Sequence, residues 1–64
     1  MKTYTLEELR KKNQLTQNQV GEHLGVSRQA VQQFEKGESS PKLSTIKRIL
    51  DLYKVKFEQI DWPD

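Results

Sequence analysis

Residues 15–37 read LTQNQVGEHLGVSRQAVQQFEKG, and this stretch predicts two short helices over 17–24 and 28–36. Apolar side chains recur at helical spacing, as Val20 and Leu24 do one turn apart. Only three residues join the two helices, so the chain cannot reverse into a hairpin of long antiparallel helices. It must turn a sharp corner, which is the geometry of a helix-turn-helix motif.

Two glycines suit this corner. Gly25 accepts the positive φ angle that the turn requires, and Gly21 leaves room where the helices cross steeply. Ser27 can cap the second helix, because its hydroxyl can accept an N–H of the first turn. Gly37 is placed to end that helix in the left-handed conformation. The glycines, the Ser27 cap and the apolar spacing within residues 15–37 therefore all predict the same motif.

The rest of the chain also shows helical spacing. It predicts helices near 6–13 and 44–53 and a short turn near 57–61, and the alternation typical of strands is almost absent. We therefore expect an all-α fold within a single domain over residues 1–64. The expected core consists of ten apolar side chains: Leu6, Leu9, Leu15, Val20, Leu24, Val31, Phe34, Ile46, Ile49 and Leu50.

The helix starts carry capping signals. Thr5 with Glu8, and Thr16 with Gln19, have the spacing of a capping box, in which a hydroxyl and a longer side chain each satisfy one backbone N–H. Ser44 is the expected cap of the helix over 44–53.

The charges are unevenly distributed. The net charge is +2, but the tail over 58–64 holds three acidic and no basic residues, so all eleven basic side chains lie in residues 1–57. A basic body with a short acidic tail fits a polyanionic partner, and an ordinary solvated surface explains the same charges equally well. Lys47 and Arg48 are either steering charges or part of such a surface.

Composition excludes several classes of function. The chain has no cysteine, and His23 has no second ligand nearby, so we expect no disulfide and no metal site. Scattered carboxylates and the lack of a glycine-rich phosphate loop argue against an enzyme or a cofactor. The chain has neither a long apolar run nor the apolar core of a secretory signal, so we expect no membrane partner and a cytoplasmic location.

Residues 15–37 resemble the helix-turn-helix of the Cro/repressor (XRE-like) family, to which lambdoid phage repressors and Cro proteins belong, and the resemblance extends over about 6–60. It implies a compact five-helix domain that binds operator DNA, usually as a dimer. Gly21 replaces the usual Ala, and Phe34 replaces the usual Trp or Tyr. Lys56 stands where a Ser or Thr normally caps the last turn, which leaves the geometry of residues 56–64 open.

The motif places its second helix in the major groove. The outward side chains should then be Arg28, Gln29, Gln32 and Gln33. Arg28 suits guanine, and Gln29 and Gln33 suit adenine, whereas Gln32 would reach a base or only a phosphate. A solvated polar face is the alternative.

Groups beside that helix should contact the DNA backbone, because helix N-termini and polar side chains bind phosphate. The candidates are Gln17, Asn18, Ser27, Lys36, Ser39, Ser40, Lys42 and the N–H of Leu43. The resemblance also implies an ion pair between Arg10 and Glu35 that orients the second helix and leaves Arg10 near a phosphate.

The C-terminal half carries the candidate dimer or partner surface, which comprises Leu52, Tyr53, Val55, Phe57, Ile60 and Trp62. Phe57 and Trp62 either cap the core or pair with a second copy. We expect a transcriptional regulator, by family default a phage or bacterial repressor that binds a palindromic operator as a homodimer. The alternative is a protein-interaction module that modulates a second regulator or acts as an antitoxin.

Overall fold

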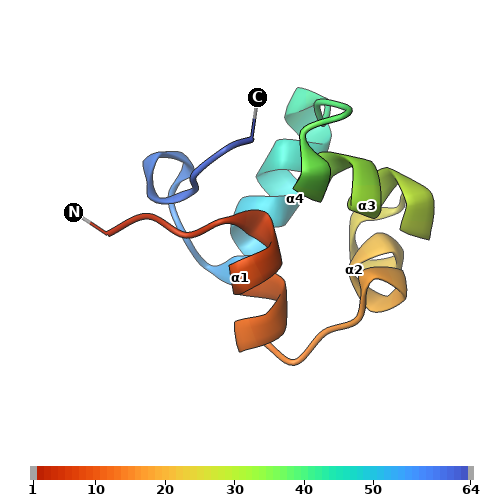
Figure 1. The fold of residues 1–64 in the computed structure, drawn as a ribbon, viewed down its shortest axis with the longest axis horizontal. Helices are drawn as coiled ribbons and strands as arrows, with labels where there is room; N and C mark the ends of the chain where they lie inside the picture. Colours follow the sequence, from red (N-terminus) through yellow and green to blue (C-terminus); the bar gives the residue numbers. More distant parts are fainter. Residues whose placement is uncertain (1, 64) are drawn as a thin grey trace.

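The computed structural model describes residues 2–63, which form four α-helices and one 3-10 turn. These are α1 (Leu6–Lys12), α2 (Gln17–Leu24), α3 (Arg28–Lys36), α4 (Leu43–Tyr53) and η1 (Phe57–Gln59). The described residues contain no β-strand, so the expected all-α class is confirmed. α2 and α3 occupy one end of the longest axis, and η1 lies near the N-terminus at the other (Figure 1). Within residues 2–63 no helix is long and apolar enough to span a membrane.

Both predicted capping boxes are present. The N–H of Thr5 donates to Glu8 Oε1 at 2.9 Å, and the N–H of Glu8 donates to Thr5 Oγ1 at 3.1 Å. Thr16 and Gln19 repeat this arrangement at the same two distances. The hydrogen bond from the backbone of Thr5 lowers the pKa of Glu8, because it stabilises the carboxylate. Local sequence therefore sets where α1 and α2 begin.

The expected cap at Ser44 is wrong. α4 begins one residue earlier, with Lys42 in the N-cap position and no capping side chain. The carbonyl of Lys42 accepts the N–H of Ile46 at 2.8 Å and so closes the first turn before Ser44 can act as the cap. The start of α4 is consequently left uncapped and open.

The turn η1 begins without the Ser or Thr hydroxyl that normally caps it, because Lys56 stands at the N-cap position. The side chain of Gln59 accepts the N–H of Lys56 at 2.8 Å, as the longer side chain of a capping box does, and the N–H of Gln59 donates to the backbone carbonyl of Lys56 at 3.0 Å instead of to a hydroxyl. The backbone then pairs with the N-terminal segment, because the N–H of Tyr4 donates to Gln59 O at 2.9 Å and that of Asp61 donates to Tyr4 O at 2.7 Å. These long-range bonds hold residues 59–61 against the segment that precedes α1.

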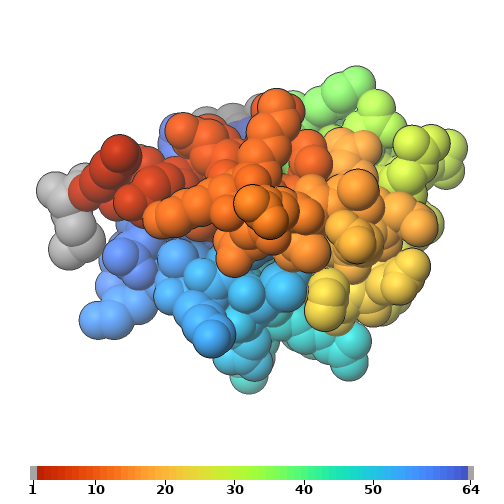
Figure 2. Space-filling model, turned by 90° about the horizontal axis from the view of Figure 1, so that it is seen from below, coloured from red at the N-terminus to blue at the C-terminus, as the bar shows by residue number. Residues whose placement is uncertain are grey.

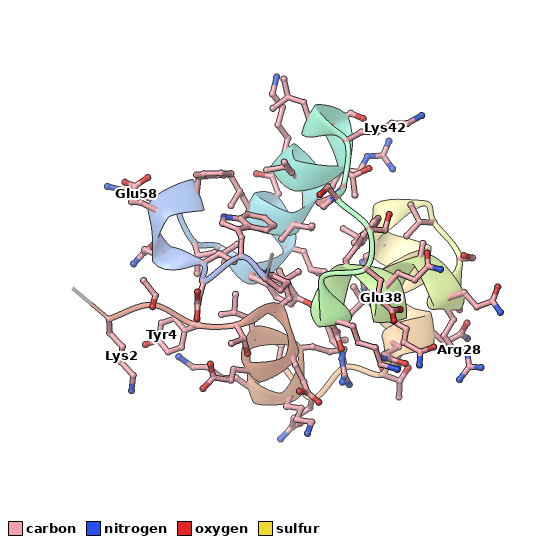
Figure 3. All side chains as sticks on the ribbon, turned by 45° about the horizontal axis from the view of Figure 1, so that its top comes forward. Lys2, Tyr4, Arg28, Glu38, Lys42 and Glu58 are labelled. Carbon is pink, nitrogen blue, oxygen red and sulfur yellow. The ribbon has the colours of Figure 1, made fainter. Side chains whose placement is uncertain are left out.

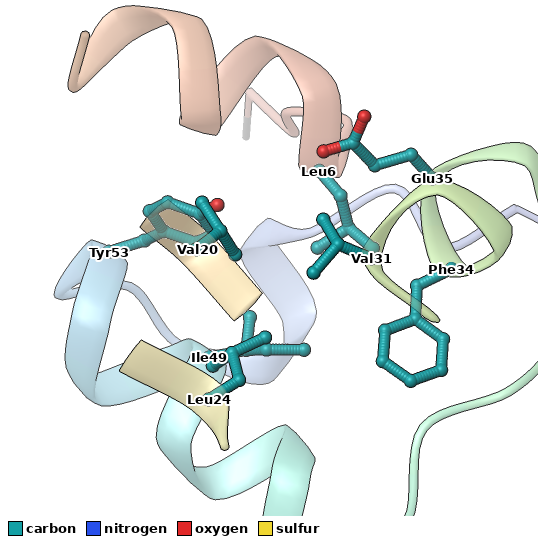
Figure 4. Close-up of a pocket in the computed structure, with 8 residues that line it drawn as sticks. All are labelled: Leu6, Val20, Leu24, Val31, Phe34, Glu35, Ile49 and Tyr53. Carbon is teal, nitrogen blue, oxygen red and sulfur yellow. The ribbon is translucent and has the colours of Figure 1, made fainter. Parts of the chain in front are cut away.

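Nine side chains form the buried core: Leu6, Leu9, Val20, Leu24, Val31, Phe34, Ile49, Tyr53 and Ile60. Side chains from all four α-helices meet there (Figure 4), around a cavity of about 10 Å³ that offers no more room than one water molecule. Of the expected core residues, Leu15, Ile46 and Leu50 are only half-buried.

The assignment of Tyr53 and Ile60 to a partner surface is wrong. Tyr53 is 7% exposed and Ile60 is 4% exposed, so neither is accessible to a partner. Tyr53 follows Ile49 by one turn and shares its inward face, and the bridge to Tyr4 draws Ile60 inward.

Candidate nucleic-acid interface

The corner between α2 and α3 is closely packed. Gly25 ends α2 with a φ of 75°, and the N–H of Val26 donates to Gly21 O at 2.9 Å. Ser27 then caps α3, since its hydroxyl accepts the N–H of Ala30 at 3.1 Å. A β carbon on Gly21 would lie only 2.7 Å from the carbonyl oxygen of Val26. A side chain at Gly21 would therefore force the backbone of this corner to shift.

The exposed face of α3 carries Arg28, Gln29 and Gln33. Val31 and Phe34 are buried on the opposite face, which fixes the rotation of the helix. Within residues 2–63 the side chains of Arg28, Gln29 and Gln33 form no hydrogen bond, and Arg28 extends into solvent (Figure 3). The face thus offers unpaired guanidinium and amide groups, the kinds that recognise base edges in a major groove.

Gln32 is less available than these three side chains. It is half-buried, so it lies at the margin of the exposed face.

Glu35, near the end of α3, is bound to two other segments. Arg10 Nε donates to Glu35 Oε2 at 2.7 Å, and Arg10 Nη1 donates to the carbonyl of Leu15 at 3.1 Å. The side chains of Arg10 and Glu35 are only 12% and 8% exposed. The hydrogen bond to Glu35 raises the pKa of Arg10, because it stabilises the charged guanidinium. α1 and α3 are thus joined by a partly buried ion pair.

Gln17 also takes part in this network. Its side-chain amide donates to Glu35 Oε1 at 3.2 Å, so the amide is already engaged within the chain. The sequence predicted that Gln17 binds a phosphate. In this structure its side-chain amide is occupied, so the backbone N–H at the start of α2 is the group of Gln17 that is left for a phosphate. Asn18, the next residue, is exposed.

A groove runs between the corner and the start of α4, and its lining includes Val26, Ala30, Ser39, Ser40 and Lys42. Leu43, the first residue of α4, is 70% exposed. The first N–H groups of an α-helix have no partner within the helix, and no side chain caps this one. Of the remaining candidates, Lys36 is exposed, and Ser27 uses its hydroxyl as the cap of α3.

Arg48 has a role that the sequence did not reveal. Its Nη1 donates to the carbonyl of Leu24 at 3.3 Å, at the last residue of α2. A cation at this position compensates the negative end of the helix dipole. No local pattern identifies this contact, because it depends on how α4 crosses the end of α2.

Glu58, the first acidic residue of the C-terminal segment, lies far from the exposed face of α3. Glu58 is at the opposite end of the molecule from Arg28 (Figure 3). A negatively charged ligand that approached Arg28 would therefore not meet the carboxylate of Glu58.

A family model for helix-turn-helix proteins matches residues 6–60. The match begins at the first residue of α1 and ends directly after η1, so it includes all five helical elements. No curated protein matches the chain.

Proposed function

The chain belongs to the Cro/C1-type (XRE-like) helix-turn-helix family of DNA-binding regulators, and from this premise we propose that it recognises a specific operator in duplex DNA through α3. The observation that carries the proposal is the face of Arg28, Gln29 and Gln33, exposed and unpaired on a helix that is otherwise fixed. We propose that the chain acts as a regulator rather than as an enzyme. Repression in a bacterial or phage-infected cell is the usual action of this family.

Base recognition follows from the chemistry of this face. Arg28 can donate two hydrogen bonds to O6 and N7 of guanine, and the amides of Gln29 and Gln33 match N6 and N7 of adenine. Gln29 and Gln33 are one helical turn apart, so they can read different base pairs. Gln32, at the edge of the exposed face, contacts either a base or a phosphate.

Backbone contacts flank the recognition helix on both sides. Asn18 and the N–H of Gln17 lie at the start of α2, and Lys42 and the N–H of Leu43 lie at the start of α4. Helix N-termini bind phosphate through free N–H groups and the helix dipole. We place Ser27, Lys36, Ser39 and Ser40 in the same backbone-contacting set.

A dimer would join two such helices. Phe57 is 51% exposed, and its ring lies 5.1 Å from that of Trp62, so the pair forms an apolar patch that this chain covers only in part. We propose that the patch, together with the half-buried Leu52 and Val55, pairs with a second copy. A two-fold dimer of this kind places two recognition helices about 34 Å apart, one turn of DNA.

The same patch supports a second candidate function. An exposed phenylalanine can dock another regulator or a toxin, and the chain would then act as a modulator or antitoxin. The base-reading face of α3 and the aromatic patch use different residues, so the two roles can coexist.

Random-site selection with the purified chain tests the proposal. We expect an enriched palindromic motif with half-sites about one turn apart, and sedimentation on that DNA should give the mass of a dimer. A chain that prefers no sequence even at low salt would overturn sequence-specific binding and favour the second candidate.

A further inference from the structure

Glu7 introduces a negative charge into the proposed DNA-contacting region. A groove beside the N-terminus of α3 is lined by residues of α1 and the start of α2 together with Arg28. Figure 2 shows the face on which α1 and the start of α2 lie side by side. The charged residues that line the groove are Glu7, Arg10, Lys11 and Arg28.

The basic residues of the groove are not equally available. Arg10 is neutralised by Glu35 at 2.7 Å, whereas Arg28 forms no ion pair within residues 2–63. Lys11 Nζ lies 3.3 Å from Glu7 Oε2, and Arg10 Nη2 lies 3.9 Å from the same oxygen. The carboxylate of Glu7 is therefore paired with the ammonium group of Lys11, which could otherwise pair with a DNA phosphate.

We propose that Glu7 limits the affinity of the chain for duplex DNA of any sequence. A phosphate bound to Lys11 would lie within the Debye length of about 8 Å from Glu7, so at low salt their repulsion is screened only in part. The phosphate must also displace Glu7 from Lys11. Because phosphate contacts carry no sequence information, the limit applies to specific and non-specific DNA alike. This inference rests on the proposed function.

The test is Glu7→Gln, measured by fluorescence anisotropy on a short duplex of random sequence and on the selected operator. We expect about two- to fivefold tighter binding to both at low salt. The slope of log K against log salt should steepen by up to about one, because Lys11 becomes free to release a counterion. The gain should shrink as salt rises.

Glu58→Gln is the matched control. It changes the net charge equally, but Glu58 lies outside the groove and at the opposite end of the molecule from Arg28, so we expect it to leave both affinities unchanged. Equal gains from the two variants, or no gain from Glu7→Gln, would overturn the proposal. A gain cannot arise from partial unfolding, which only weakens binding. If the unaltered chain binds neither duplex, the proposed function fails and this inference fails with it.

Discussion

Gly21 and the carbonyl oxygen of Val26 are so close that a β carbon on Gly21 would stand 2.7 Å from that oxygen. The oxygen belongs to the backbone of the corner, so it cannot rotate aside as the tip of a side chain can. Ser27, which caps α3, follows directly and would have to move as well. The position of the recognition helix therefore depends on the missing side chain at Gly21.

Gly21→Ala should lower the free energy of unfolding by about 1 kcal/mol. Alanine gains about 1 kcal/mol of helix propensity, and overpacking against a backbone oxygen costs about 1–3 kcal/mol. Urea unfolding followed by circular dichroism measures the difference. Glu22→Ala, at an exposed position of the same helix, is the control and should change little. A Gly21→Ala chain more stable than the original would show that the corner relaxes freely.

The ion pair between Arg10 and Glu35 should be worth more than a surface pair, because both side chains are largely buried. Glu35→Gln keeps the shape but removes the charge that Arg10 contacts, and we expect a loss of about 2 kcal/mol. Together with Arg10→Met it completes a double-mutant cycle, whose coupling energy should be about 1–3 kcal/mol. Losses that simply add in the double variant would contradict this coupling.

Tyr53 should make the fold sensitive to alkali. Burial raises the pKa of Tyr53 from 10.0 to about 12, and the charge of Glu35 adds to the shift while Arg10 opposes it. The unfolded chain then loses the phenolic proton at a lower pH than the folded chain does. The stabilisation is complete below pH 10 and is lost as pH rises toward about 12.

Tyr53→Phe should therefore lose less stability than the unaltered chain between pH 10 and pH 12. Thermal midpoints across this range provide the measurement, with Tyr4→Phe as the control. Identical pH profiles for Tyr53→Phe and the unaltered chain would show that the hydroxyl ionises equally well in the folded state.

The sequence predicted those features that arise from residues close together in the chain. The capping box of Thr5 and Glu8 and the corner at Gly25 depend on spacing and backbone conformation alone. The pairing of Arg10 with Glu35 was accessible only through resemblance to a family, because the two residues are far apart in sequence.

Features that depend on how helices meet were missed. Ile60 is buried because a backbone bridge to Tyr4 turns it inward, and Arg48 reaches Leu24 only because α4 crosses the end of α2. The engagement of Gln17 by Glu35 has the same origin. Apolar or polar character alone does not indicate any of these contacts.

The recognition of base pairs by α3 is tested most directly by repeating the selection with Gln29→Ala. The side chain is exposed and unpaired within the described chain, so the variant should unfold at the same temperature as the unaltered protein. We expect it to lose its preference at one base-pair position in each half-site and to bind the original operator about 1–3 kcal/mol more weakly. Recovery of the same motif with unchanged affinity would contradict the claim that this face of α3 reads DNA.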